Sequence, residues 1–245
     1  MPISIASRIR VLVVDDSASM RMLIKTILSS DPLIEVVDVA SDGIEALEKA
    51  RILKPDLITM DVEMPRMDGI TAVRQIMSKS PVRILMLSSL TREGASTTLE
   101  ALEAGALDYV AKSTSGSFAG ELRAKVKDTA KSRLSCVSTA RQPVIRSTVQ
   151  SLSSLLKGRK PGIIGIGAST GGPVAVTELL SAIPPGFPYP ICVAVHMPKA
   201  FTPAFADRLN GKCPLNVKEA ADGEIVKSRS EEHTSELQSR INISY

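Results

Sequence analysis

Short apolar runs alternate with helical patterns over the first half of the chain. The runs are continuous rather than alternating, and they lie at 9–14, 35–40, 56–61, 83–89 and 108–111. Between them, segments such as MRMLIKTILSS and GIEALEKARIL carry apolar residues at helical spacing. Continuous apolar strands that alternate with helices are typical of a parallel sheet covered on both faces. Residues 1–130 are therefore predicted to form an α/β domain with a five-stranded, doubly wound parallel sheet.

A second alternation of strands and helices begins after Lys160. The apolar start PGIIGIGASTGGP is followed by VAVTELLSAI, ICVAVHMP, FTPAFADRLN and LNVKEA. Strands joined through helices are parallel. We therefore expect residues 161–228 to form the N-terminal part of a second doubly wound parallel α/β domain. Residues 131–160 are basic, rich in Ser and Arg, and have no strong strand pattern, which predicts a linker between the two domains.

Polar residues follow several strands of the first domain, at the edge where ligands bind in such sheets. Asp15 and Asp16 end the first predicted strand, and Asp61 ends the third. Ser88 lies at the end of the fourth strand, and Lys112 follows the fifth. Three carboxylates at one edge repel each other, and a hard cation such as Mg²⁺ relieves that repulsion through oxygen ligands. A carboxylate nucleophile beside a lysine and a hydroxyl suits phosphoryl transfer through an acyl phosphate.

Four motifs in this domain resemble those of the receiver domain of two-component response regulators: VLVVDDSASMR, LITMDVEMPRMDGI, MLSSLT and DYVAKS. The resemblance implies that Asp61 accepts a phosphoryl group from a partner histidine kinase. It also implies that Mg²⁺ is held by Asp16, Asp61 and the backbone carbonyl of Glu63, with Asp15 in the outer shell. Its implied phosphoryl contacts and activation switch are Ser88, Lys112 and Tyr109.

One position departs from the receiver pattern. Receivers usually have a proline after the lysine, often with a cis peptide bond, whereas Ser113 follows Lys112 here. A cis bond before a residue other than proline costs about 3 kcal/mol. We therefore expect a trans bond and a different placement of Lys112; the alternative is an unusual cis bond held by its surroundings.

The stretch GIGASTGGP, residues 165–173, has two interpretations. A dinucleotide loop needs G-x-G-x-x-G and an acid after the second strand, but the third glycine comes one place late and His196 ends that strand. A nucleophile turn fits better, because G-x-S-x-G places Ser169 between a strand and a helix. A serine hydroxyl needs a base. His196 is expected on the same sheet edge, whereas His233 lies in a polar tail.

The receiver motifs, together with IGASTGGP, VHMP, FADRLN and VKEAADGE, resemble the chemotaxis protein-glutamate methylesterase family over residues 8 to about 227. The resemblance implies hydrolysis of methyl esters on chemoreceptor glutamates and deamidation of receptor glutamines, with no cofactor in the catalytic domain. It assigns Ser169 and His196 to a Ser-His-Asp triad, and Thr170 and Gly171 to the oxyanion region. It places the triad aspartate beyond the end of this chain, which is therefore expected to be a very poor esterase.

The acidic residues after His196 offer no clear third member of the triad. None stands at a recognisable strand end with suitable spacing; those before the tail are Asp207, Glu219, Asp222 and Glu224. The segment RSEEHTSELQSR, residues 229–240, breaks the α/β pattern and resembles the translation of a sequencing-library adapter. We therefore expect residues 229–245 to be a non-native tail that does not pack with the domain; the alternative is a natural polar segment.

Composition limits the location and the partners. The 3 cysteines are widely spaced, which is typical of reduced thiols. No apolar run approaches the ~18 residues of a membrane helix. We therefore expect a cytoplasmic protein without membrane insertion. By resemblance, its partners are the chemotaxis histidine kinase and the methyl-accepting chemoreceptors.

Positive charge is concentrated in one part of the chain, since residues 120–160 hold 10 basic and 2 acidic residues. A basic strip can bind nucleic acid. However, the sequence after the linker has the pattern of strands rather than of a helix-turn-helix. We therefore expect no nucleic-acid partner. Two competing hypotheses are a receiver with a DNA-binding output and a non-catalytic phosphoreceiver protein.

Overall fold

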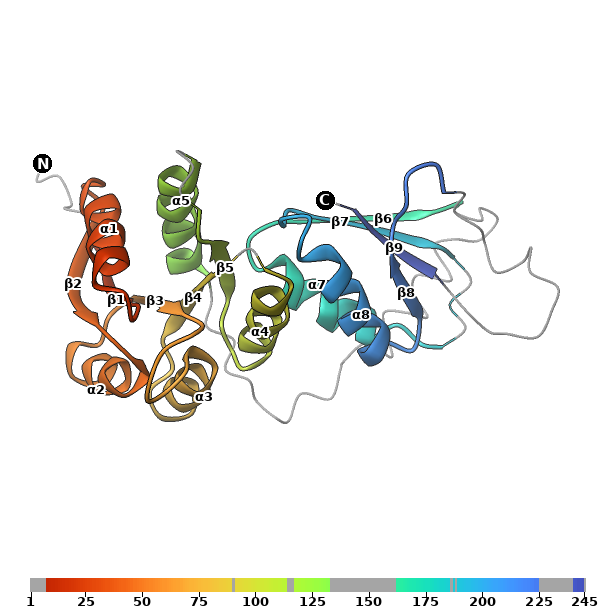
Figure 1. Ribbon diagram of the computed structural model, residues 1–245. Coiled ribbons are helices and arrows are strands. Elements are labelled where there is room, and N and C mark those ends of the chain that lie inside the picture. The colour runs from red at the N-terminus through yellow and green to blue at the C-terminus, as the bar shows by residue number, and fades with distance from the viewer. Residues whose placement is uncertain are drawn as a thin grey trace, which may run out of the picture. The chain divides into compact units, whose positions relative to one another are not determined.

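The computed structural model describes residues 8–89, 91–113, 117–132, 162–185, 187, 189–224 and 240–244. The chain divides into two compact units, Met1–Cys136 and Val137–Tyr245 (Figure 1). The division falls inside the predicted linker, of which residues 133–160 lie outside the described residues. Each unit is a parallel α/β structure, as the alternating pattern predicts.

Unit 1 is a five-stranded parallel sheet with the strand order β2-β1-β3-β4-β5. Its strands are β1 (Ile9–Val14), β2 (Ile34–Ala40), β3 (Leu57–Asp61), β4 (Arg83–Ser88) and β5 (Asp108–Ala111). Its helices are α1 (Ala18–Ser29), α2 (Gly43–Leu53), α3 (Gly69–Lys79), α4 (Arg92–Glu103) and α5 (Ser117–Lys131). Helices α1 and α5 cover one face, and α2, α3 and α4 cover the other (Figure 1). The doubly wound five-stranded sheet is confirmed.

The sequence explains both the buried strands and the helix starts of unit 1. Residues 11–14 of β1 are fully buried, as expected of a central strand with helices on both faces. Four helices begin after a polar residue whose side chain accepts a backbone N–H: Ser17, Asp42, Asp68 and Thr91. These caps fix the loops at the carboxyl edge of the sheet, where the functional residues lie.

Unit 2 contains a four-stranded parallel sheet with the order β6-β7-β9-β8. Its strands are β6 (Ile164–Ala168), β7 (Ile191–Val195), β8 (Asn216–Glu219) and β9 (Arg240–Ser244), and its helices are α7 (Gly172–Ser181) and α8 (Thr202–Lys212). Both helices lie on the same side of the sheet and contact each other (Figure 1). A side chain added at Gly165 or Gly167 would meet no described atom within 4 Å, so this side of β6 is open among the described residues.

The prediction that residues 229–245 do not pack with the domain is wrong for Arg240–Ser244. Strand β9 lies between β7 and β8 and pairs in parallel with both, with Ile241 opposite Ile191 and Val217. Unpaired strands expose rows of N–H and C=O groups that attract another strand. The sequence RINIS alternates isoleucine with polar residues and therefore suits that position. Residues 229–239 and 245 lie outside the described residues.

None of the described helices has both the length and the apolar character that crossing a membrane requires.

Candidate functional site

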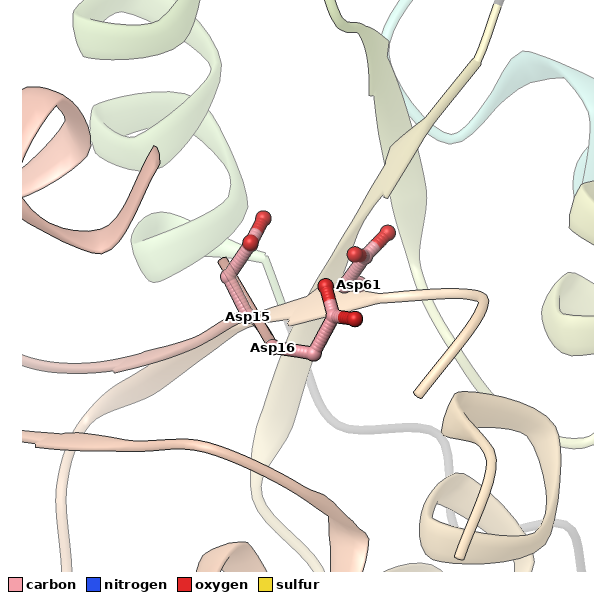
Figure 2. A group of neighbouring side chains, drawn as sticks. All are labelled: Asp15, Asp16 and Asp61. Carbon is pink, nitrogen blue, oxygen red and sulfur yellow. The ribbon is translucent and has the colours of Figure 1, made fainter. Parts of the chain in front are cut away.

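Three carboxylates meet at the carboxyl edge of the sheet in unit 1 (Figure 2). Asp15 and Asp16 follow β1 and Asp61 ends β3, and one oxygen from each lies within 4.8 Å of the others. Asp15 is 0% exposed and Asp61 6% exposed, whereas Asp16 is open to solvent. Clustered carboxylate oxygens are the donors that Mg²⁺ prefers. The predicted convergence is confirmed, and the cluster could hold a metal ion.

Lys112 completes this cluster. Its Nζ lies 2.8 Å from Asp15 Oδ2 and 2.7 Å from Asp61 Oδ2. The Lys112–Ser113 peptide bond is trans, as expected. With this trans bond the ammonium still reaches both buried carboxylates. The Lys112 N–H donates to the Ser88 carbonyl at 2.7 Å. The Lys112 ammonium is thus shared by two buried carboxylates.

Burial affects the protonation of both Asp61 and Lys112. It raises the pKa of Asp61 from 3.8 to about 6, an effect that Lys112 reduces and the charge of Asp15 reinforces. Burial also opposes the charged form of Lys112, but the hydrogen bonds to Asp15 and Asp61 outweigh it and raise the lysine pKa. The ammonium therefore stays protonated, and Asp61 needs compensating positive charge to be a full carboxylate.

The Ser88 hydroxyl is engaged with helix α4. Its Oγ lies 3.1 Å from the Gly94 carbonyl oxygen, and the hydroxyl of Thr98 donates to it at 2.5 Å. Both Ser88 and Thr98 are fully buried. Thr98 was not predicted from the sequence, because nothing in STTLEAL distinguishes it from the neighbouring threonine. Its contact joins the Ser88 hydroxyl to helix α4.

Tyr109 lies inside unit 1 and is 2% exposed. Burial, followed by the nearby charges of Asp108 and Glu121, raises the pKa of its phenol. The Lys125 ammonium lies 4.9 Å from the centre of the Tyr109 ring and donates to the Tyr109 carbonyl at 2.7 Å. Lys125 of helix α5 therefore contacts both the ring and the backbone carbonyl of Tyr109.

Glu63 follows Asp61 by two residues, and its side chain is exposed. The N–H of Val62 donates to Asp61 Oδ1 at 2.8 Å, which orients the Asp61 carboxylate at the start of the loop. The predicted use of the Glu63 carbonyl as a ligand stays a prediction.

In unit 2, the turn after β6 carries Ser169, and His196 follows β7. The two residues are neighbours across the sheet, because Ala168 pairs with Val195 and the His196 N–H donates to the Ala168 carbonyl at 3.0 Å. Both side chains are exposed. Among the described residues, no hydrogen bond joins the Ser169 hydroxyl to the His196 imidazole.

Glycines make the turn at Ser169 tight. Gly171 has φ 73°, a left-handed conformation that suits glycine, and precedes the first turn of α7. The Gly172 N–H donates to the Ser169 carbonyl at 2.6 Å, and a Cβ at Gly172 would lie 2.8 Å from that of Ala168. Thr170 lies beside this helix start and is half-buried. The local form agrees with a nucleophile turn that faces the helix N-terminus.

No acid in the described part of unit 2 is hydrogen bonded to His196. Asp207 on α8 and Asp222 after β8 are exposed. Glu219 accepts from the buried Thr202 hydroxyl, and Glu224 pairs with Lys218. The imidazole therefore lacks the orienting carboxylate of a complete triad within these residues.

Comparison with known proteins identifies both units. Residues 11–126 match the model of the response regulator receiver domain, and residues 164–230 match that of the CheB methylesterase. A protein-glutamate methylesterase/protein-glutamine glutaminase of Geobacter sulfurreducens is 50% identical over 234 residues, covering 90% of this chain and 64% of that protein. Its counterpart in Aliivibrio fischeri is 43% identical over 263 residues, covering 89% of this chain and 67% of that protein.

Among solved structures, the response regulator domain of Thermotoga maritima CheB matches with 52% identity and a TM-score of 0.48, covering 51% of this chain and 98% of that one. The chain spans 64% of the length of the Geobacter relative. With this identity and coverage, the chain belongs to the protein-glutamate methylesterase/protein-glutamine glutaminase family.

Proposed function

We propose that the protein is a phosphorylation-regulated hydrolase that removes methyl esters from chemoreceptor glutamates and deamidates receptor glutamines. The observation that carries this proposal is the similarity, over about nine tenths of the chain, to proteins named for both activities. The two sites in the chain supply matching chemistry: an acceptor carboxylate in unit 1, and a serine turn opposite a histidine in unit 2.

In unit 1, an oxygen of Asp61 attacks the phosphorus of a phosphohistidine on the chemotaxis kinase. The P–N bond breaks, the kinase imidazole leaves, and an acyl phosphate forms on Asp61. Asp16, Asp61 and the Glu63 carbonyl would hold Mg²⁺, with Asp15 in its outer shell, and the cation supplies positive charge for the phosphoryl oxygens.

Lys112 and Ser88 are the proposed contacts of the phosphoryl group. Lys112 already pairs with Asp61, so its ammonium stands where negative charge accumulates. Ser88 would turn from Thr98 toward the phosphoryl oxygen, and Tyr109 would reorient with it. The phosphoryl group thereby favours one of two arrangements of β4, α4 and β5.

In unit 2, His196 takes the proton of Ser169 as the serine oxygen attacks the ester carbonyl. N–H groups in the region of Thr170 and Gly171 stabilise the oxyanion, methanol leaves, and water then hydrolyses the acyl-serine. With a glutamine substrate the leaving group is ammonia. This chemistry requires no cofactor.

The triad also requires a carboxylate to orient His196. We propose that this acid lies beyond the 245 residues, within the further length of the relatives, since none of the described acids is bonded to the imidazole. The chain alone is then a competent phosphoacceptor and a very poor esterase. We further propose a cytoplasmic protein without nucleic-acid partners or membrane insertion, which acts on the cytoplasmic part of its receptors.

Methanol release from methylated receptor membranes tests the proposed function. A version extended by the C-terminal third of the family should release methanol, and acetyl phosphate with Mg²⁺ should increase the rate. Ser169→Ala should abolish release, whereas Asp61→Ala should remove only the response to acetyl phosphate. Release that is equal with and without acetyl phosphate would contradict the proposed regulation, and release by Ser169→Ala would contradict the proposed nucleophile.

A further inference from the structure

The loop between β3 and α3, residues 62–68, contains a non-glycine residue in the left-handed region. Arg66 has φ 64°. Residues other than glycine rarely adopt such values, and they persist where the surrounding structure holds them, often at functional sites. The same loop carries Glu63, whose carbonyl is the proposed cation ligand, three residues before Arg66.

Asp42 is what holds Arg66. The arginine Nη2 donates to Asp42 Oδ2, although the two residues are 24 positions apart. The other oxygen of Asp42 accepts the N–H groups of Ile44 at 2.9 Å and Glu45 at 3.0 Å, and so caps α2. The Asp42 side chain is 2% exposed and that of Arg66 is 61% exposed. A buried carboxylate thus uses both oxygens, one for its helix and one for the loop.

A second contact ties the same two elements. The N–H of Gly43 donates to the Met67 carbonyl at 3.1 Å. A Cβ at Gly43 would lie 2.7 Å from Met67 Cγ, so the start of α2 and the loop are packed with no room between them. The N–H of Gly69 donates to the Val62 carbonyl at 2.9 Å and closes the loop on itself. The start of α2 therefore holds the end of the loop at Met67, and the beginning of the loop at Val62 is bonded to Gly69.

We propose that Asp42 and Arg66 are positioning residues for the cation site. Their ion pair holds the 62–68 loop so that the Glu63 carbonyl stays beside Asp61, and neither residue contacts the cation. A charge-assisted hydrogen bond from guanidinium to a buried carboxylate is strong enough to hold such a loop. The inference rests on the proposed receiver function and adds to it the residues that shape the site.

Electrostatics alone predicts a different result from positioning. Removing the positive charge of Arg66 would strengthen Mg²⁺ binding, because a nearby positive charge repels the cation. Removing the negative charge of Asp42 would weaken it. In the double variant the two changes would cancel. Positioning instead predicts weaker binding for each single variant and no further weakening for the double variant, because either change releases the same loop.

Calorimetric titration of the full chain with Mg²⁺ tests the proposal with Arg66→Gln, Asp42→Asn and the double variant. Asparagine caps helices as well as aspartate, so Asp42→Asn keeps the helix start. Arg74→Gln is the matched control: Arg74 is 58% exposed and pairs with Glu100 of α4 at 2.6 Å, so it removes an exposed arginine ion pair that does not involve Asp42. Arg66→Lys should recover part of the affinity, since it keeps the charge.

We expect about fivefold weaker Mg²⁺ binding for each single variant and for the double variant, less than the tenfold or more typical of groups that hold ligands directly. The Gly43 amide should exchange faster with solvent in the same variants, whereas Arg74→Gln should match the parent. Tighter binding by Arg66→Gln, or parental affinity in the double variant, would overturn the positioning role but not the proposed receiver site. A parent chain that binds no Mg²⁺ would overturn the proposed receiver site and this inference with it.

Discussion

The two candidate sites of this protein differ in how complete they are. In unit 1, Asp15, Asp61 and Lys112 are already in contact and largely buried, with distances of 2.7 and 2.8 Å. In unit 2, Ser169 and His196 are neighbours through the backbone, but both side chains are exposed and not bonded to each other. Both sites lie at the carboxyl edge of a parallel sheet, so the topology alone does not cause the difference.

The difference follows from what surrounds each edge. Helices cover both faces of the sheet in unit 1, so the carboxylates lose water and Lys112 must compensate them. In the described part of unit 2, one side of β6 is open at Gly165 and Gly167. A preformed site needs a covered sheet that fixes its side chains, and unit 2 lacks that cover among the described residues.

The largest expected effect is the loss of phosphorylation on changing Asp61. Asp61→Asn should eliminate covalent labelling by radiolabelled acetyl phosphate with Mg²⁺, because the amide is not a nucleophile and Lys112 keeps only Asp15 as a carboxylate partner. Asp68→Asn is the matched control, since Asp68 is an exposed helix cap in the same region and asparagine also caps. Stoichiometric labelling of Asp61→Asn would show that the complete site is not the acceptor.

The second largest effect concerns the incomplete site. The 245-residue chain should hydrolyse receptor methyl esters about 10⁴-fold more slowly than the extended version, since an unoriented imidazole costs a serine triad about that factor. Methanol release from the same membranes measures both. Comparable rates would mean that a residue within this chain orients His196, and Asp207 or Asp222 would then be the residues to substitute.

The sequence predicted the strands of unit 1 closely, because buried parallel strands are continuous apolar runs that end at polar residues. It also predicted that Asp15, Asp61 and Lys112 converge, since topology alone brings strand ends together. It did not predict Thr98 or the Asp42–Arg66 pair, which depend on how helices pack and on one left-handed residue. Nor did it predict β9, because the choice of a strand for an open position is a tertiary effect.

A smaller effect should appear in stability without metal. The pKa of Asp61 is about 6 in the folded protein against 3.8 ordinarily, so the folded state binds this proton more tightly. The contribution of Asp61 to the free energy of unfolding should therefore fall as pH rises from about 4 to about 6. Asp61→Asn removes this cost and should stabilise unit 1 at pH 7.5 by up to about 3 kcal/mol.

Urea unfolding at pH 4.5 and pH 7.5, with EDTA to remove metal, measures this effect. The transition that belongs to unit 1 is the one that Mg²⁺ shifts in a separate experiment on the parent chain. Ser169→Ala provides the comparison with unit 2: its hydroxyl is exposed and makes no hydrogen bond to a described residue, so no stability change is expected. If Asp61→Asn were no more stable than the parent at pH 7.5, the buried carboxylate would not be a cost to folding.

The smallest expected effect lies at the contact between Ser88 and Thr98. Thr98→Val keeps the shape but removes the hydroxyl that donates to Ser88 at 2.5 Å. Ser88 keeps the Gly94 carbonyl as a partner, so the free energy of unfolding should fall by only about 1 kcal/mol.

The same variant tests the proposed turn of Ser88 from Thr98 toward the phosphoryl group. That turn breaks the contact with Thr98, so removing the contact should tighten binding of beryllofluoride, a phosphoryl mimic, by up to about fivefold. Thr97→Val is the matched control, since Thr97 bonds only to carbonyls within α4. Unchanged beryllofluoride affinity in Thr98→Val would mean that the contact stabilises unit 1 without restraining the switch, and the preformed site would then be rigid at Ser88 as well.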